Sequence, residues 1–101
     1  MPKRILVADD EPDVLRVVQY RLTKKGYEVI FAVNGKEALE KIKSEMPDLV
    51  LMDYRMPFLD GLQVCRLVKE DQKLKHIPVI IFSASGDALT NDQLFATHAD
   101  G

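Results

Sequence analysis

Residues 5–13, ILVADDEPD, contain the pattern from which the fold can be worked out. The apolar run 5–8 has no polar alternation, which is typical of a strand covered on both faces of a sheet. It ends abruptly in Asp9 and Asp10, and Glu11 follows. Adjacent carboxylates repel each other, and burying an unpaired one costs several kcal/mol or shifts its pKa. Two acids at the end of a core strand therefore need a physical reason.

Outward from this stretch, helical and strand patterns alternate along the chain. Further apolar strands are expected at 28–32, 49–52 and 79–82, and helices over about 12–25, within 33–47, over 62–70 and over 90–97. Such βαβαβαβα alternation with short turns predicts an α/β domain with a parallel sheet, right-handed crossovers and helices on both faces.

The acids are expected to meet at one edge of this sheet. Asp53 follows the third strand, as Asp9 and Asp10 follow the first, and Ser83 follows the fourth. Ligands of open parallel sheets bind beyond the carboxyl ends of the strands. If strands one and three are neighbours, three carboxylates converge there, and Mg²⁺ would stabilise them. Calcium suits the site less, because the Asp/Asn and Gly spacing of a calcium loop is absent from the sequence.

A simpler interpretation is that these acids cap a helix. Asp10 or Glu11 could favour the positive end of a helix that starts near Pro12. Two acids after one strand, matched by a third after another, favour a binding site over capping. Cys65 and His76 are interpreted as structural residues.

Composition places limits on the other function classes. The 101 residues are expected to form one domain, 1–101, with 47% hydrophobic and 30% charged residues and a net charge of −2. This balance argues against a surface for nucleic acid or an anionic membrane. The single cysteine excludes an internal disulfide, so a cytoplasmic location fits best. No apolar run approaches the ~20 residues of a membrane span, and no phosphate-binding glycine motif is present.

Three segments resemble the receiver domain of bacterial two-component response regulators. They are Asp9-Asp10 after the first strand, LVLMDYRMPFLDG around Asp53, and VIIFSAS at the fourth strand. The resemblance spans residues 3–101. It implies a flavodoxin-like, doubly wound parallel sheet of strand order 2-1-3-4-5.

The resemblance also implies a role for each acid. Asp53 would accept a phosphoryl group from the phosphohistidine of a sensor histidine kinase or a phosphotransfer protein. Asp10 and Asp53 would ligate Mg²⁺ directly, together with the backbone carbonyl of Arg55. Asp9 would contribute through a water molecule.

Other positions would control the acyl phosphate and its readout, according to the same resemblance. Ser83 would be the switch hydroxyl that turns toward the phosphoryl group. Arg55 and Ser85 occupy positions that tune the lifetime of the acyl phosphate. The loop after the acceptor would be shaped by Met56, Pro57, Asp60 and Gly61.

The chain departs from the family pattern at its end. Receivers continue after a segment such as Ala99-Asp100-Gly101 into a fifth strand with a Lys-Pro step and a fifth helix, and no lysine follows Lys75. The expectation is a sheet of order 2-1-3-4 and a domain that is incomplete at its C-terminus. An exposed fourth strand and an uncovered sheet face would then favour self-association or a swapped dimer.

Three functions remain open from the sequence. The first is a phospho-accepting receiver, which is not an enzyme beyond self-phosphorylation and autodephosphorylation. The second is a receiver-like interaction module that no longer switches, although such a module has no need for three converging acids. The third is a phosphatase-like hydrolase, which would need a second acid where Arg55 stands.

Overall fold

Four strands and three helices alternate along residues 2–82, the part of the chain that the computed structural model describes. The strands are β1 (Arg4–Ala8), β2 (Glu28–Ala32), β3 (Leu49–Asp53) and β4 (Val79–Phe82). The helices are α1 (Pro12–Lys24), α2 (Gly35–Glu45) and α3 (Gly61–Glu70). Each predicted element within this range is present, with ends that differ by one or two residues. The helix expected over 90–97 lies outside the described residues.

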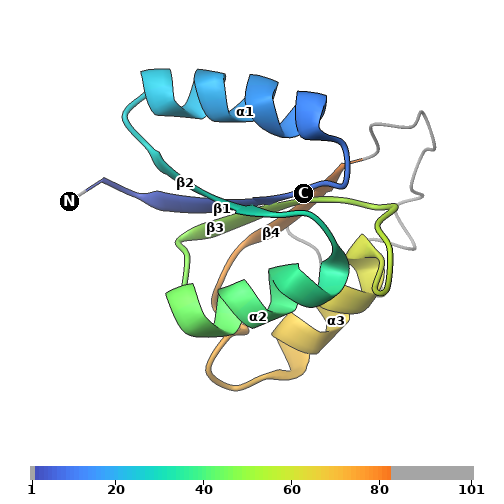
Figure 1. Cartoon of the computed structure of the whole chain (residues 1–101). Coiled ribbons are helices and arrows are strands. Elements are labelled where there is room, and N and C mark those ends of the chain that lie inside the picture. Colours follow the sequence, from blue (N-terminus) through green and yellow to red (C-terminus); the bar gives the residue numbers. More distant parts are fainter. Residues whose placement is uncertain (1, 83–101) are drawn as a thin grey trace.

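The strands form one parallel sheet in the order β2-β1-β3-β4. Helix α1 covers one face of the sheet, and α2 and α3 cover the other (Figure 1). This arrangement confirms the predicted doubly wound fold and its strand order. Because β1 pairs directly with β3, with Ala8 opposite Met52, the segments that follow these strands emerge side by side.

Local sequence signals explain where the helices begin and end. Helix α1 starts at Pro12, a residue whose fixed φ suits the first helical turn. The Asn34 side chain caps α2 by accepting a hydrogen bond of 2.7 Å from the Glu37 N–H. At α3, Asp60 and Gln63 form a reciprocal capping box.

The core is divided between the two faces of the sheet. The larger cluster lies between the sheet and helices α2 and α3, and it includes the fully buried Ile42, Val50, Met52 and Val64. The smaller cluster lies under α1 and is built around Ile5, Val7 and Leu15.

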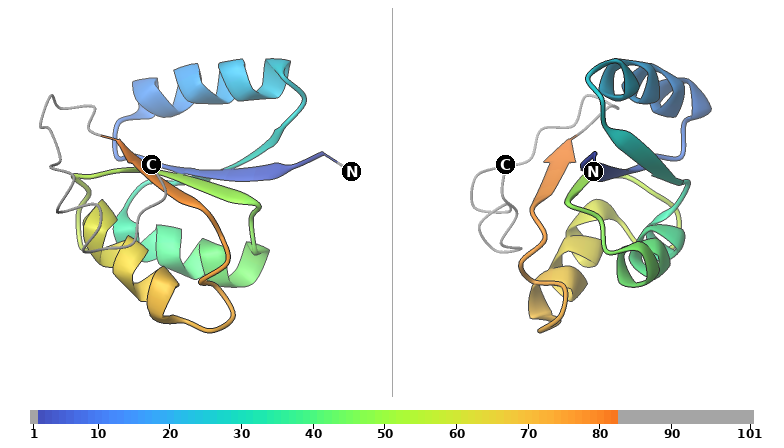
Figure 2. Two further views of the ribbon diagram at one scale, coloured as in Figure 1. Left: turned by 180° about the vertical axis from the view of Figure 1, so that it is seen from behind. Right: turned by 90° about the vertical axis from the view of Figure 1, so that its left-hand side faces the viewer.

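The α1 face is less completely covered than the opposite face. Leu49 and Leu51 of β3 pack against the α1 cluster but are only half-buried. Side chains alternate along a strand, so Ile80 and Phe82 of β4 share this face with them, and both are half-buried. Figure 2 shows β4 at the opposite edge of the sheet from β2. Within the described residues, an apolar strip on β3 and β4 therefore remains half exposed.

No helix among residues 2–82 is long and apolar enough to cross a membrane.

A methyl group at Gly35 is expected to destabilise the fold. A Cβ placed there would lie 1.9 Å from the Leu59 carbonyl oxygen, so the backbone of the β3–α3 loop would have to move. This overpacking should outweigh the better helix propensity of alanine, and Gly35→Ala should lower the free energy of unfolding by roughly 2 kcal/mol. Urea denaturation would measure it. The neighbouring exposed variant Lys36→Ala is the control, and equal stability of the two variants would contradict the packing argument.

Candidate functional site

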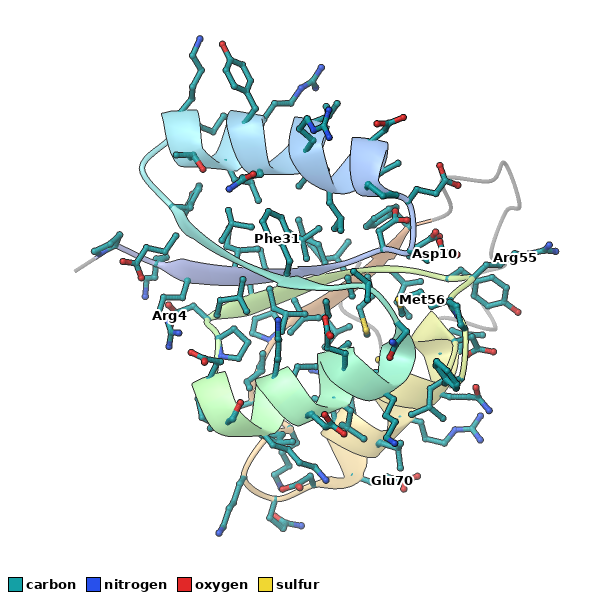
Figure 3. The ribbon with its side chains drawn as sticks, in the orientation of Figure 1. Arg4, Asp10, Phe31, Arg55, Met56 and Glu70 are labelled. Atoms are coloured by element: carbon teal, nitrogen blue, oxygen red, sulfur yellow. The ribbon has the colours of Figure 1, made fainter. Side chains whose placement is uncertain are left out.

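Three acids come together at the carboxyl ends of β1 and β3. Asp9 and Asp10 directly follow β1, and Asp53 is the last residue of β3. Each contributes a carboxylate oxygen to a group in which these oxygens lie within 4.8 Å of one another. Figure 3 shows Asp10, Arg55 and Met56 at this same end of the sheet. The geometry thus produces the convergence that the strand pattern predicted.

Two of these acids are withdrawn from solvent. Asp9 is fully buried and Asp53 is only 2% exposed, whereas Asp10 is exposed. Asp9 Oδ1 accepts a hydrogen bond of 2.9 Å from the Glu11 N–H. Its second oxygen, Oδ2, is buried without a hydrogen-bond partner among the described residues. Buried polar atoms are nearly always satisfied, so this oxygen requires a partner that residues 2–82 do not supply.

The electrostatics of Asp9 reflect this environment. The pKa of Asp9 is raised from 3.8 to about 6, chiefly by burial, with smaller contributions from the nearby charges of Asp53, Asp10 and Glu11; the hydrogen bond from the Glu11 N–H acts in the opposite direction. A hard divalent cation would give the unpartnered oxygen a partner and would reduce the repulsion between the acids. The three-carboxylate donor set fits Mg²⁺, which is bound through oxygen and keeps several waters.

Helix capping does not account for the acids. Glu11 is the N-cap residue of α1, but its side chain makes no capping hydrogen bond. Asp9 supports the turn with one oxygen only, and Asp10 lies near the other two acids. The capping interpretation is therefore not supported by the local geometry.

The loop from β3 to α3 forms the second wall of the site. The Tyr54 N–H donates to the Phe82 carbonyl and its own carbonyl accepts from the Gly61 N–H, both at 2.8 Å. A Cβ at Gly61 would lie 2.6 Å from the Asp53 carbonyl oxygen, so a side chain here would collide with the backbone of Asp53. The Arg55 N–H makes a long 3.4 Å hydrogen bond to Asp53 Oδ1.

This loop borders an open depression next to the acids, in which Met56 is nearly buried and Pro57 is exposed. Its lining residues are Asp10, Tyr54, Arg55, Met56, Pro57 and Asp60. Of the three acids, Asp10 lines this depression. The predicted switch residue Ser83 and the rate-tuning residue Ser85 lie outside the described residues.

Two residues at this edge were not predicted from the sequence. Gly35, at the start of α2, donates its N–H to the Pro57 carbonyl at 3.3 Å and so fastens the loop to a second helix. Phe58 has a φ of 71° and is 79% exposed. Asn34-Gly35 is a readable turn signal, but nothing in the sequence indicates the conformation of Phe58.

Comparison with known proteins decides the family. Residues 5–101 match the sequence model of the response regulator receiver domain. The chain belongs to the response regulator receiver domain family. The receiver domain is 42% identical over 87 residues to the alkaline phosphatase synthesis transcriptional regulatory protein PhoP of Bacillus subtilis. That match covers 86% of this chain but 35% of PhoP, so the chain spans about a third of this relative.

Solved receiver structures have the same fold. The chemotaxis response regulator CheY4 of Vibrio cholerae superposes with a TM-score of 0.90 at 26% identity, covering all of this chain and 84% of CheY4. The Mn²⁺-bound form of the response regulator Rcp1 gives a TM-score of 0.85 at 28% identity, covering 98% of this receiver domain and 78% of Rcp1.

Asn in place of Asp9 is expected to stabilise the receiver domain in Mg²⁺-free buffer at neutral pH. Because the pKa of Asp9 is higher in the folded state, about 6 against 3.8, the folded state holds more protons between these values. The contribution of Asp9 to the free energy of unfolding therefore falls as pH rises through this window, by about 3 kcal/mol in total. Asp9→Asn should be more stable than the unaltered chain at pH 7 and similar near pH 4.

Thermal denaturation in chelator-containing buffers across this pH range measures the difference. Glu40→Gln, a neutral substitution at an exposed position of α2, is the control. A gain for Asp9→Asn that is equally large at both ends of the range would contradict the titration of Asp9 as its cause.

Proposed function

We propose that this receiver domain is a phospho-acceptor in which Asp53 takes a phosphoryl group from the phosphohistidine of a sensor histidine kinase or phosphotransfer protein, with Mg²⁺ as cofactor. The observation that carries the proposal is the buried Asp9 oxygen without a partner, next to a second buried acid at the end of β3. A module that serves only for association gains nothing from this costly arrangement.

The chemistry follows from the position of Asp53. One of its carboxylate oxygens attacks the phosphorus, the phosphorus–nitrogen bond of the phosphohistidine breaks, and the departing imidazole nitrogen keeps the electron pair. The carboxylate and the phosphoryl group are both anionic, so their approach is opposed by charge repulsion. Bound Mg²⁺ would supply the neutralising charge and help hold the reacting atoms in line.

The cation would be held by Asp10, Asp53 and the backbone carbonyl of Arg55, with Asp9 acting through water. The similar protein Rcp1 has a Mn²⁺-bound form, which is consistent with a divalent cation as cofactor. Asp9 and Asp10 would place negative charge where the cation sits, while Gly61 lets α3 begin directly against the Asp53 backbone.

The product would carry an added charge of roughly −1.5 to −2 at the edge of the sheet. Such a local change can shift a two-state element when it stabilises one state by a few kcal/mol. Ser83 as the switch hydroxyl, with Arg55 and Ser85 tuning the lifetime of the phosphoryl group, remains a prediction. The domain would be an acceptor rather than an enzyme, it would act in the cytoplasm, and it would bind no nucleic acid itself.

Phosphorylation with a small-molecule donor tests the acceptor. Incubation with phosphoramidate and Mg²⁺ should add one phosphoryl group, detectable by intact mass spectrometry, and chelation of Mg²⁺ should abolish the adduct. Asp53→Asn should prevent formation of the adduct, since the carboxamide lacks the anionic oxygen that attacks the phosphorus. The matched control is Asp13→Asn, which changes an exposed acid in the first turn of α1. An adduct that survives in Asp53→Asn, or none in the unaltered chain, would overturn the proposal.

Self-association is a second, separable part of the proposal. The half-exposed strip of Leu49, Leu51, Ile80 and Phe82 supports it, because exposed apolar surface favours contact with another chain. Sedimentation should show a concentration-dependent dimer, which Leu51→Asp should weaken. A monomer at every concentration tested would refute self-association and leave the acceptor function untouched.

A further inference from the structure

The conformation of Phe58 is unfavourable for an aromatic residue. Its φ of 71° lies in the left-handed region, which bulky side chains rarely adopt. The Leu59 N–H donates to the Pro57 carbonyl at 2.9 Å, which closes a three-residue turn around Phe58. A γ-turn with positive φ is rare and strained. Glycine would relieve this strain, so the presence of phenylalanine needs an explanation.

Core packing does not supply that explanation. The Phe58 side chain is 79% exposed, more than any other large hydrophobic residue among the described ones, of which Tyr20 is next at 62%. An aromatic ring in this state stabilises the folded chain little, because its apolar surface remains in water. Strain of this kind clusters at functional sites, where surrounding structure maintains it.

The surrounding structure holds this turn firmly. The Pro57 carbonyl accepts a second hydrogen bond, from the Gly35 N–H at the start of α2. On the other side of Phe58, Leu59 is half-buried against the larger core cluster. Gly35 and Leu59 are so close that a methyl group does not fit between them. With both neighbours anchored, the ring of Phe58 is held away from the core.

Phe58 belongs to the loop that borders the acceptor site, between Pro57 and Asp60, which both line the depression there. Asp10 of the acid cluster lines it as well. Asp53 is only 2% exposed, so a protein that delivers a phosphoryl group to it must press its own surface against this loop. Phe58 does not line this depression, so a small phosphodonor that enters it is not expected to depend on the ring.

We propose that Phe58 is a docking residue for the protein phosphodonor, whose apolar surface beside the phosphohistidine receives the ring. This inference rests on the proposed function. Aromatic side chains are enriched among the few residues that carry most of an interface's binding energy. The backbone that carries the ring is already held by hydrogen bonds before binding, which reduces the conformational entropy lost on association.

The test compares protein and small-molecule donors for the Phe58→Gly variant, which removes the ring from a backbone conformation that glycine adopts freely. A panel of purified, autophosphorylated histidine-kinase cores is first screened with the unaltered chain, and the fastest donor is used. The matched control is Met46→Gly. Met46 also has a positive φ, 47°, and is 43% exposed, but it ends α2 at the amino-terminal edge of the sheet.

For Phe58→Gly, the second-order rate constant of transfer from the kinase should fall at least about tenfold relative to the unaltered chain. The rate of phosphoramidate labelling should stay within about twofold of that of the unaltered chain. Met46→Gly should leave both rates unchanged, Phe58→Tyr should restore kinase transfer, and thermal melting of Phe58→Gly should show no loss of stability.

Kinase transfer unaffected in Phe58→Gly overturns the inference. So does a chain that accepts from phosphoramidate but from no kinase core. Loss of sedimenting dimer in Phe58→Gly with normal transfer would instead assign the ring to a second copy, and would also overturn it. Failure of phosphoramidate labelling in the unaltered chain refutes the proposed function itself.

Discussion

The repulsion between carboxylates that the sheet forces together is the constraint on which the site depends. Parallel pairing of β1 with β3 places Asp9 and Asp53 at one edge, and both are almost fully buried. Solvent cannot screen these charges, and one Asp9 oxygen has no partner among the described residues. The arrangement is therefore unfavourable by itself, and it becomes favourable when positive charge is bound. Under the proposed function, a bound cation would relieve this repulsion.

Apolar burial in the rest of the described structure compensates for this repulsion between the carboxylates. The strands that lead to the acids are among the most completely buried parts of the chain, with Leu6, Val7, Ala8, Val50 and Met52 all fully buried. Burial of apolar surface on this scale offsets the cost of a few unfavourable groups. Two unfavourable features lie at the carboxyl edge of the sheet, namely the buried Asp9 with its raised pKa and the positive φ of Phe58.

The β3–α3 loop links the acid cluster to two helices. Gly61 allows α3 to start against the Asp53 backbone, and Gly35 allows α2 to contact the turn at Pro57. Both contacts depend on the absence of a side chain, so each glycine is needed for a close approach of backbones rather than for an unusual φ. The position of Asp53 is thus set by helices as well as by its own strand.

The sequence by itself determined the alternation of elements, and its resemblance to the receiver family implied the strand order that brings Asp9, Asp10 and Asp53 together. The alternation follows from local signals such as the apolar runs and Pro12, and the expectation that the acids meet follows from the rule that parallel strands end at a common edge. Tertiary structure alone decided the burial of each acid, the raised pKa of Asp9 and the outward position of Phe58. Those properties depend on which distant atoms surround a group, such as Leu59 against Gly35, and such contacts leave no periodicity in the chain because the two residues are far apart in it.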